Sequence, residues 1–218
     1  MGQGDDAARQ AADAAPLPVD QERADLDQVV RLAVADRAVL QRVLRGLVSK
    51  DEKVRHNCYQ VLAEIAESQP RVLDPAWDTL VALLDSRNAF HRATGVSLIA
   101  ILAGADPEGR FERIFDRYFD LLGDDKVMVA RYLARSAGRV ARAKPHLQAR
   151  IVDRLLGIDQ IQHKHKDLIK ADVIASFAEF FEGSPDQERM RAFVKRQVDS
   201  SSPKTWKAAR QFLDRFGG

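Results

Sequence analysis

The chain has 218 residues, of which 34 are Lys or Arg and 32 are Asp or Glu, so its formal net charge is only +2. This balance excludes a polyanion-binding surface that covers the whole chain, and any basic site must be local. The length is sufficient for a large core, and a single cysteine, Cys58, cannot form an internal disulfide. We find no membrane-spanning apolar run and no signal-peptide pattern, and we expect a cytoplasmic protein without membrane contact.

The first 20 residues are rich in Ala, Asp, Gln, Gly and Pro and have no apolar periodicity, which predicts a disordered tail. An amphipathic helix is predicted at about residues 22–34, where one face carries Leu26, Val29, Val30 and Ala33. We expect this helix to cap the open end of the structure that follows it.

From there on, a repeat of 37 to 40 residues runs through the chain. It is marked by four prolines: Pro70, Pro107, Pro145 and Pro185. Before each proline an apolar trio recurs at i, i+4, i+7 spacing, which is typical of one helix face, and a fifth trio lies near the C-terminus. The trios are Cys58, Leu62, Ile65; Gly95, Ile99, Leu102; Leu133, Ala137, Val140; Val173, Phe177, Phe180; and Ala209, Leu213, Phe216.

A second apolar helix precedes each trio, so each repeat is predicted to be a helical hairpin. Its apolar positions are Leu40, Val43, Leu47; Trp77, Leu80, Leu84; Phe115, Tyr118, Leu122; Ile151, Leu155, Ile158; and Met190, Val194, Val198. No alternating strand pattern occurs. The five hairpins cover about residues 36–70, 71–107, 108–145, 146–185 and 186–218, within a single predicted domain over 21–218.

Residues at the helix boundaries agree with this division. Asp74-Pro75 and Ser202-Pro203 pair an N-cap acceptor with a proline suited to the first helical position. Ser184 to Gln187, "SPDQ", has the pattern of a capping box. Pro70, Pro107 and Pro145 instead follow the second helices and are expected to end them.

The pattern resembles the HEAT and armadillo class of α-solenoids over about residues 36–216. The resemblance rests on "DEKVRHNCYQVLAEIAESQP" and "SRNAFHRATGVSLIAILAGADP", in which Arg55 and Arg92 occupy equivalent positions. Ala130 replaces this arginine in the third hairpin, and the fourth carries an insertion around "DQIQHKHKDL". The resemblance implies an all-α fold, a right-handed α-α superhelix of about five hairpins with an N-terminal capping helix. It also implies that the second helices line a concave, partner-binding surface.

The second helix of the third hairpin, within "RYLARSAGRVARAKP", has an arginine-rich face opposite its core face: Arg131, Arg135 and Arg142, with Arg139 at the edge. Arg139 and Arg142 align with Glu179 and Glu182 in the next hairpin, so lateral ion pairs are expected there.

Arg131 and Arg135 align only with small residues: Ala93 and Ser97 before them, Ala171 and Ala175 after them. With no acid in register, we predict that these two arginines form the centre of an anion-binding patch. The patch would extend to Lys164, Lys166 and Lys170, and along the same strip to His56 and Gln60 in the first hairpin. The alternative is an ordinary solvated face.

Other residue types give no catalytic pattern. His163 and His165 are spaced unsuitably for joint metal ligation and are expected in an exposed basic loop. Cys58 belongs to a core trio and is predicted to be an inert thiol. Phe181 is larger than its counterparts in other hairpins and either fills space left by the insertion or marks an apolar contact near the C-terminal end. No phosphate-binding loop or hydrolase motif occurs, so we expect no enzyme activity, cofactor or metal.

We therefore predict a noncatalytic scaffold or adaptor that binds a protein or another macromolecule on its concave face, with the arginine patch recognising an anion. The alternative is a nucleic-acid-binding protein, including a DNA glycosylase acting on alkylated purines, since some of these enzymes are HEAT-like. Their groove pairs aromatic residues with a catalytic carboxylate, whereas here Trp77 and Asp78 fall on different faces and Trp206 has Arg210 four residues on. The sequence specifies no partner, pathway or oligomeric state.

Overall fold

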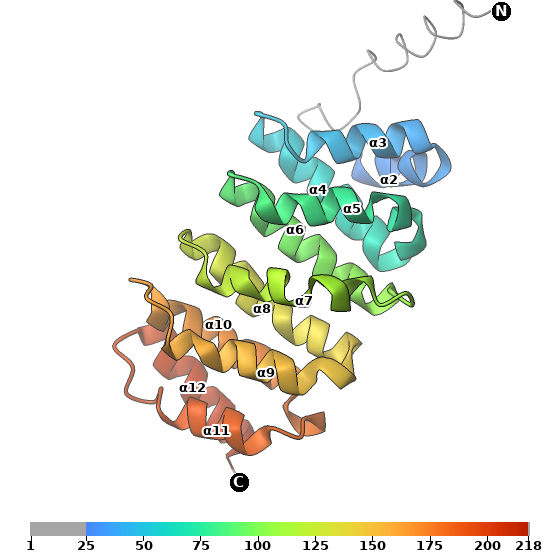
Figure 1. The fold of residues 1–218 in the computed structure, drawn as a ribbon. Helices are drawn as coiled ribbons and strands as arrows, with labels where there is room; N and C mark the ends of the chain where they lie inside the picture. Colours follow the sequence, from blue (N-terminus) through green and yellow to red (C-terminus); the bar gives the residue numbers. More distant parts are fainter. Residues whose placement is uncertain (1–24, 218) are drawn as a thin grey trace, which may run out of the picture. The chain divides into compact units, whose positions relative to one another are not determined.

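The computed structural model describes residues 25–217, and every regular element in that range is helical (Figure 1). The predicted tail over residues 1–20 lies outside the described residues. The described chain falls into two compact units, an N-terminal unit that ends at Trp77 and a C-terminal unit that begins at Asp78. The division falls at the start of α5 (Trp77–Ala82). A single domain over 21–218 therefore stays a prediction.

The N-terminal unit contains α2 (Leu26–Ala35), α3 (Arg37–Gly46), α4 (Glu52–Ser68) and the 3-10 segment η2 (Pro70–Ala76). Each α-helix begins after an aspartate whose side chain accepts a backbone N–H of the first turn: Asp25, Asp36 and Asp51. Helix α2 packs against both α3 and α4 and buries Val29 and Ala33, as expected for a capping helix in this unit. The Cys58 side chain is buried.

The C-terminal unit holds the remaining elements. Its α-helices after α5 are α6 (Ala89–Leu102), α7 (Arg110–Asp120), α8 (Val127–Ala143), α9 (Gln148–Leu156), α10 (Lys166–Ala178), α11 (Gln187–Lys195) and α12 (Pro203–Phe216). Short 3-10 segments follow or connect them: η3 (Leu83–Asp85), η4 (Ala103–Ala105), η5 (Leu121–Gly123), η6 (Pro145–Leu147), η7 (Gly157–Asp159) and η8 (Phe181–Gly183).

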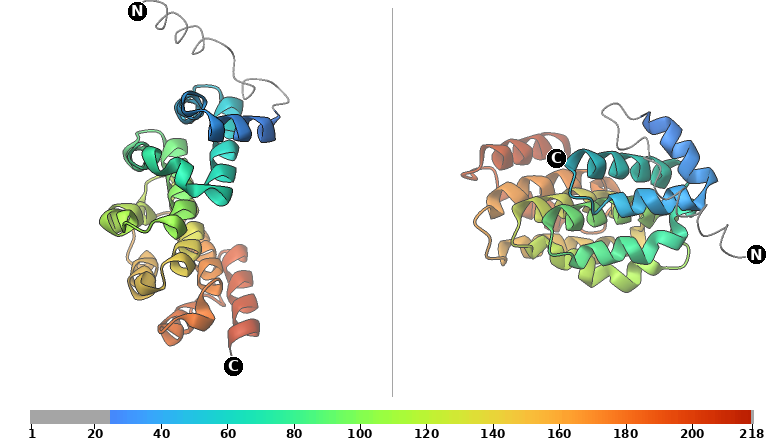
Figure 2. Two further views of the ribbon diagram at one scale, coloured as in Figure 1. Left: turned by 90° about the vertical axis from the view of Figure 1, so that its right-hand side faces the viewer. Right: turned by 90° about the horizontal axis from the view of Figure 1, so that it is seen from above.

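Within this unit the second helices of the hairpins, α6, α8, α10 and α12, form one layer, here called the inner helices. Each packs against the next, and α7, α9 and α11 form the other layer (Figure 2). Helices α8 and α10 approach closely at Gly138, where an added Cβ would lie 2.8 Å from the Ser176 carbonyl oxygen. Glycine is therefore required for this approach.

The predicted core positions are buried, with two shifts. Leu213 and Val198 are only partly covered, and the neighbouring Phe212 and Gln197 are buried instead. The ring of Phe181 is 4% exposed and packs 4.7 Å, between centroids, from Phe216 of α12. Of the two alternatives for Phe181, the observed one is therefore an apolar contact near the C-terminal end, with Phe212 and Phe216 of α12.

Two of the predicted helix starts are wrong. The chain at Asp74-Pro75 lies within η2, and the α-helix begins only at Trp77. The capping box does not form because the Ser184 N–H already donates to the Phe181 carbonyl at 3.1 Å. Helix α11 instead begins at Gln187. The start at Ser202-Pro203 is confirmed.

Arginine–carboxylate pairs connect successive hairpins across the outer layer of the C-terminal unit. Arg117 bonds Asp85, Arg154 bonds Asp120, and the Arg189 Nη2 lies 2.6 Å from Asp153 Oδ1. Exposed pairs of this kind contribute about 0–1 kcal/mol each. These three arginines therefore connect successive repeats.

The equivalent arginines of the first two hairpins have the same role. Arg55 Nη1 donates to the Ser49 carbonyl and Arg92 Nη1 to the Ser86 carbonyl, each at 2.7 Å. Arg92 Nε also donates to Asp124 of the next hairpin at 2.6 Å. Each arginine thus closes the turn before its own helix, as their equivalent positions in the sequence implied.

Candidate functional site

The arginines of α8 converge on a carboxylate of α10 that the sequence register did not predict. Asp172 is 3% exposed. Arg131 Nε donates to its Oδ2 at 2.6 Å, and Arg135 Nε donates to its Oδ1 at 3.1 Å. Lys204 Nζ, from α12, donates to the same Oδ1 at 2.9 Å. These four residues, here called the Asp172 cluster, join three of the inner helices.

The cations of the cluster outnumber its acid by three to one, which leaves a local charge of +2. The Arg131 side chain is 24% exposed, whereas those of Arg135 and Lys204 are 50% and 47% exposed. Only Nε of Arg135 bonds Asp172, so its two Nη groups have no partner among residues 25–217. Arg131 is thus the most covered partner of Asp172, whereas Arg135 and Lys204 leave positive charge exposed to solvent.

The protonation of Asp172 follows from these contacts. Burial acts to raise the pKa of Asp172, but hydrogen bonds from Arg131, Lys204 and Arg135 outweigh it and hold the pKa below its ordinary value. Asp172 is therefore ionised at neutral pH, and its charge fixes the three cations in place.

The prediction that no acid lies in register with Arg131 and Arg135 is wrong. Asp172 lies one position beyond Ala171, the residue aligned with Arg131, so it stands 41 residues after Arg131 and 37 after Arg135, and both long side chains reach it. A signal was present in the sequence: Asp172 is a lone carboxylate in the apolar run "DVIASF", and a buried charge requires partners. Lys204 had no comparable signal.

Two lysines of the insertion, Lys166 and Lys170, bond to Asp159 and do not extend the patch as predicted, whereas the place of Lys164 in the patch stays a prediction. Lys170 is only 8% exposed, and its Nζ lies 2.8 Å from Asp159 Oδ1. Lys166 Nζ donates to the Asp159 carbonyl at 3.1 Å, and Lys164 is exposed on the loop before α10. The cause is local: Asp159, which lies in the insertion itself, is the acceptor for Lys166 and Lys170.

The other predicted residues have different surroundings. Arg142 Nη2 lies 3.1 Å from Glu179 Oε2, so its lateral ion pair exists, but with Glu179 in place of Glu182. His56 and Gln60 are exposed on α4 of the N-terminal unit. Their place on the same strip as Arg135 stays a prediction.

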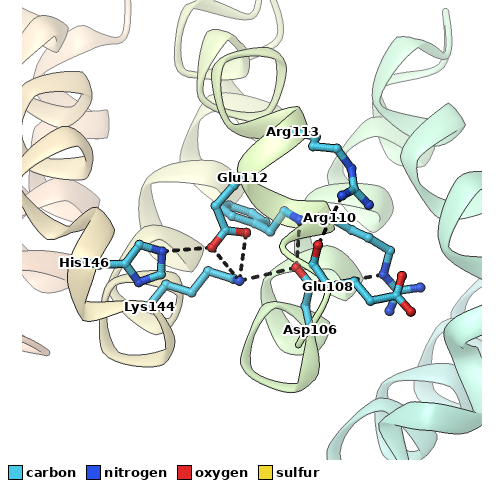
Figure 3. Close-up of polar contacts among 8 residues, drawn as sticks. Asp106, Glu108, Arg110, Glu112, Arg113, Lys144 and His146 are labelled. Atoms are coloured by element: carbon cyan, nitrogen blue, oxygen red, sulfur yellow. Dashed lines mark hydrogen bonds and ion pairs between the residues drawn. The ribbon is translucent and has the colours of Figure 1, made fainter.

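A second polar cluster lies where the α6–α7 turn meets the end of α8 (Figure 3). The Lys144 side chain is 7% exposed, and its Nζ lies 2.9 Å from both Glu112 carboxylate oxygens and 3.3 Å from Asp106 Oδ2. Asp106 also accepts the Phe111 backbone N–H at 2.8 Å. His146 Nε2 lies 2.9 Å from Glu112 Oε1. This cluster is a buried clamp between consecutive hairpins.

Both carboxyl groups of this clamp are stabilised in their ionised forms. Burial acts to raise the pKa of Asp106, but the Phe111 and Arg110 hydrogen bonds and the charge of Lys144 bring it below the ordinary value of 3.8. Burial likewise acts to raise the pKa of Glu112, but the hydrogen bond from Lys144 contributes most to lowering it below 4.5.

These shifts predict acid-induced destabilisation. Because the pKa values of Asp106, Glu112 and Asp172 are lower in the folded chain, the unfolded chain binds more protons, and the stabilisation is complete only above the ordinary pKa values. We expect the free energy of unfolding in urea to fall steadily from about pH 5 to about pH 3. The raised pKa of Glu179, caused by burial, opposes this trend. A flat profile over that range would contradict the description of both clusters.

Two further properties of residues 25–217 bear on the function. They contain no group of three or more His, Cys, Asp or Glu residues placed to hold a metal ion. His163 and His165 are 5.8 Å apart between ring centroids, and His163 Nδ1 accepts the His165 backbone N–H at 3.0 Å. None of the helices in this range is long and apolar enough to cross a membrane.

Comparison of the fold with solved structures returns helical repeat proteins. A designed armadillo repeat protein, YIII(Dq)4CqI, has a TM-score of 0.51 and 17% identity, with 91% of this chain and 97% of that chain covered. The chain has an armadillo- and HEAT-like solenoid fold. This confirms the predicted repeat class and all-α fold. An engineered protein with 17% identity follows at a TM-score of 0.44, with 88% of each chain covered. No protein-family model and no curated protein matches the sequence.

Proposed function

We propose that the chain is a noncatalytic binding module, and that the inner-helix surface of its C-terminal unit binds an acidic segment of a partner protein. The observation that carries the proposal is the +2 charge of the Asp172 cluster, two of whose cations are about half exposed. A solenoid surface of this kind is extended and rigid, which suits a peptide segment better than a small substrate.

Residues next to the cluster supply the apolar part of such a surface. Tyr132 follows Arg131 on α8 and is one of the few large apolar side chains in the described part of the chain that are exposed, at 41%. Ala175, one turn after Asp172 on α10, is exposed and leaves room for a bound segment. Aromatic and arginine side chains dominate the energetics of protein interfaces. The proposed segment therefore places an acidic group at the Asp172 cluster and an apolar side chain near Tyr132.

The charge distribution favours a protein partner over nucleic acid. The basic residues of α8 alternate with acids, since Asp172 lies among Arg131, Arg135 and Lys204, and Glu179 pairs with Arg142. A continuous polyphosphate would meet the partly exposed Glu179 beyond the Asp172 cluster, and the whole chain offers only +2 against it, whereas a single acidic group needs only the cluster.

Peptide display against the immobilised protein tests the proposal. We expect the selected peptides to be enriched in Asp and Glu and to bind more weakly as salt increases. Arg135→Gln/Lys204→Gln should weaken their binding at least about tenfold, because two charge-assisted hydrogen bonds are lost.

Arg113→Gln/Lys195→Gln is the matched control, since it removes the same charge from exposed positions on α7 and α11. Selected peptides without acidic enrichment, or equal loss in both double variants, would overturn the proposal. Tight binding of a mixed-sequence single-stranded oligonucleotide that depends on Arg135 and Lys204 would instead identify a nucleic-acid-binding protein.

A further inference from the structure

We infer that the Asp172 cluster recognises a phosphorylated side chain within the bound segment. This inference rests on the proposed function and specifies its ligand. It follows from three features of the cluster: where the two exposed donors lie, how much charge they carry, and how they are held.

The exposed donors are close together. Arg135 Nε and Lys204 Nζ bond the same oxygen, Asp172 Oδ1, at 3.1 and 2.9 Å, so these two nitrogens lie no more than 6.0 Å apart. The guanidinium of Arg135 also has two Nη groups, and the ammonium of Lys204 has two further N–H groups. A phosphoryl group offers three acceptor oxygens on one atom and so can accept hydrogen bonds from both side chains at once.

The charge of the cluster matches a phosphomonoester better than a carboxylate. Three cations and one carboxylate give +2. A phosphorylated Ser, Thr or Tyr carries about −1.5 to −2 at neutral pH, whereas Asp or Glu carries −1. A phosphodiester of nucleic acid also carries only −1 per phosphate, so the concentration of charge at one point favours a phosphorylated peptide.

Asp172 is a positioning residue in this site. It is held by Arg131 through two nitrogens, with Nε at 2.6 Å from Oδ2 and Nη2 at 3.5 Å from Oδ1, and its own Oδ1 orients Arg135 and Lys204. The donors are therefore ordered before a ligand arrives, which reduces the entropy lost on binding. A cluster without Asp172 would carry more positive charge but would lose this order.

The test uses three degenerate peptide libraries whose fixed central residue is phosphoserine, Ser or Glu, together with the full-length protein. We expect the phosphoserine library to be retained at least about tenfold more strongly than the other two at pH 7.5. Retention should fall as the pH is lowered through about 6, where the phosphate gains a proton. Arg135→Gln and Lys204→Gln should each weaken retention about tenfold, and Arg113→Gln and Lys195→Gln should not.

Asp172→Asn separates positioning from bulk charge. It makes the cluster more positive, so simple attraction predicts stronger retention of the phosphoserine library, whereas a positioning role predicts weaker retention. Thermal melts show whether Asp172→Asn is folded. If it is not, the retention measured for Arg135→Gln and Lys204→Gln still tests the phosphoryl assignment.

Equal retention of the phosphoserine and Glu libraries, both above the Ser library and both lost in Arg135→Gln, would overturn the phosphoryl assignment and leave the proposed function intact. Preference for phosphoserine that is unchanged in Arg135→Gln and Lys204→Gln would overturn both the assignment and the proposed site. Stronger retention by a folded Asp172→Asn would overturn the positioning role.

Discussion

Lys144→Met should lower the free energy of unfolding by about 3–4 kcal/mol, because it removes the cation from two carboxylates and keeps the aliphatic stem. The Asp106 side chain is 0% exposed and that of Glu112 is 29% exposed. With Lys144 gone, Asp106 retains the Phe111 N–H and Arg110 but has lost a charge partner within the core. Urea unfolding at neutral pH measures the loss.

Lys126→Met is the matched control, since the Lys126 side chain is 61% exposed and pairs with the exposed Asp125. It should cost about 0–1 kcal/mol. The difference between Lys144→Met and the parent should also shrink below about pH 4, where the carboxylates gain protons in both proteins. A cost for Lys144→Met no larger than that of the control would show that the clamp does not stabilise the fold.

Asp172→Ala should lower the free energy of unfolding by about 2–3 kcal/mol and weaken binding of the acidic segment. The loss is smaller than for Lys144 because the Arg135 and Lys204 side chains are about half exposed and can reach water. Asp172→Ala also removes the ion pairs that Asp172 of α10 makes with α8 and α12. Chemical denaturation gives the stability, and titration with a selected peptide gives the affinity.

Asp167→Ala on the same helix is the comparison. Its carboxylate side chain is 48% exposed and lies 3.7 Å from Lys170 Nζ, so we expect a cost of about 0–1 kcal/mol and no change in affinity. If Asp172→Ala were as stable as Asp167→Ala, the three cations would not depend on Asp172 for their arrangement.

The helical hairpins could be predicted from the sequence because apolar spacing and proline position depend on a few residues within one helix. The trios around Cys58, Leu133 and Val173 are buried as predicted. Helix starts were harder to predict, because a start depends on the hydrogen bonds that the residues around it make with their neighbours. At Ser184, the bond to the Phe181 carbonyl pre-empts the capping box.

The candidate site was predicted only in part, because ion pairs between hairpins depend on register to within one residue. Arg131 and Arg135 were singled out because no acid was expected in register with them, but Asp172, one position beyond the aligned Ala171, accepts hydrogen bonds from both. The clamp of Lys144 with Asp106 and Glu112 was not predicted either, since its members lie 38 and 32 residues apart at a turn. Both omissions concern charged side chains, whose partners are set by tertiary packing.

The Asp172 cluster and the Lys144 clamp are both built from ion pairs, but they differ in how much of their charge is neutralised. Lys144 is matched by two carboxylates and is covered, so its charge is neutralised within the fold. Asp172 is outnumbered by cations that remain partly exposed, so charge is left over at the surface. This surplus distinguishes a candidate binding site from a structural ion pair, and the proposed function depends on it.

Hydrogen–deuterium exchange with and without a selected acidic peptide tests the central claim most directly. The inner-helix surface of the C-terminal unit is proposed to bind the segment, so added peptide should slow exchange in α8 and α12, which carry Arg135 and Lys204. Exchange in α7 and α9 should not change. Protection confined to α7 and α9, with α8 and α12 unaffected, would contradict the account.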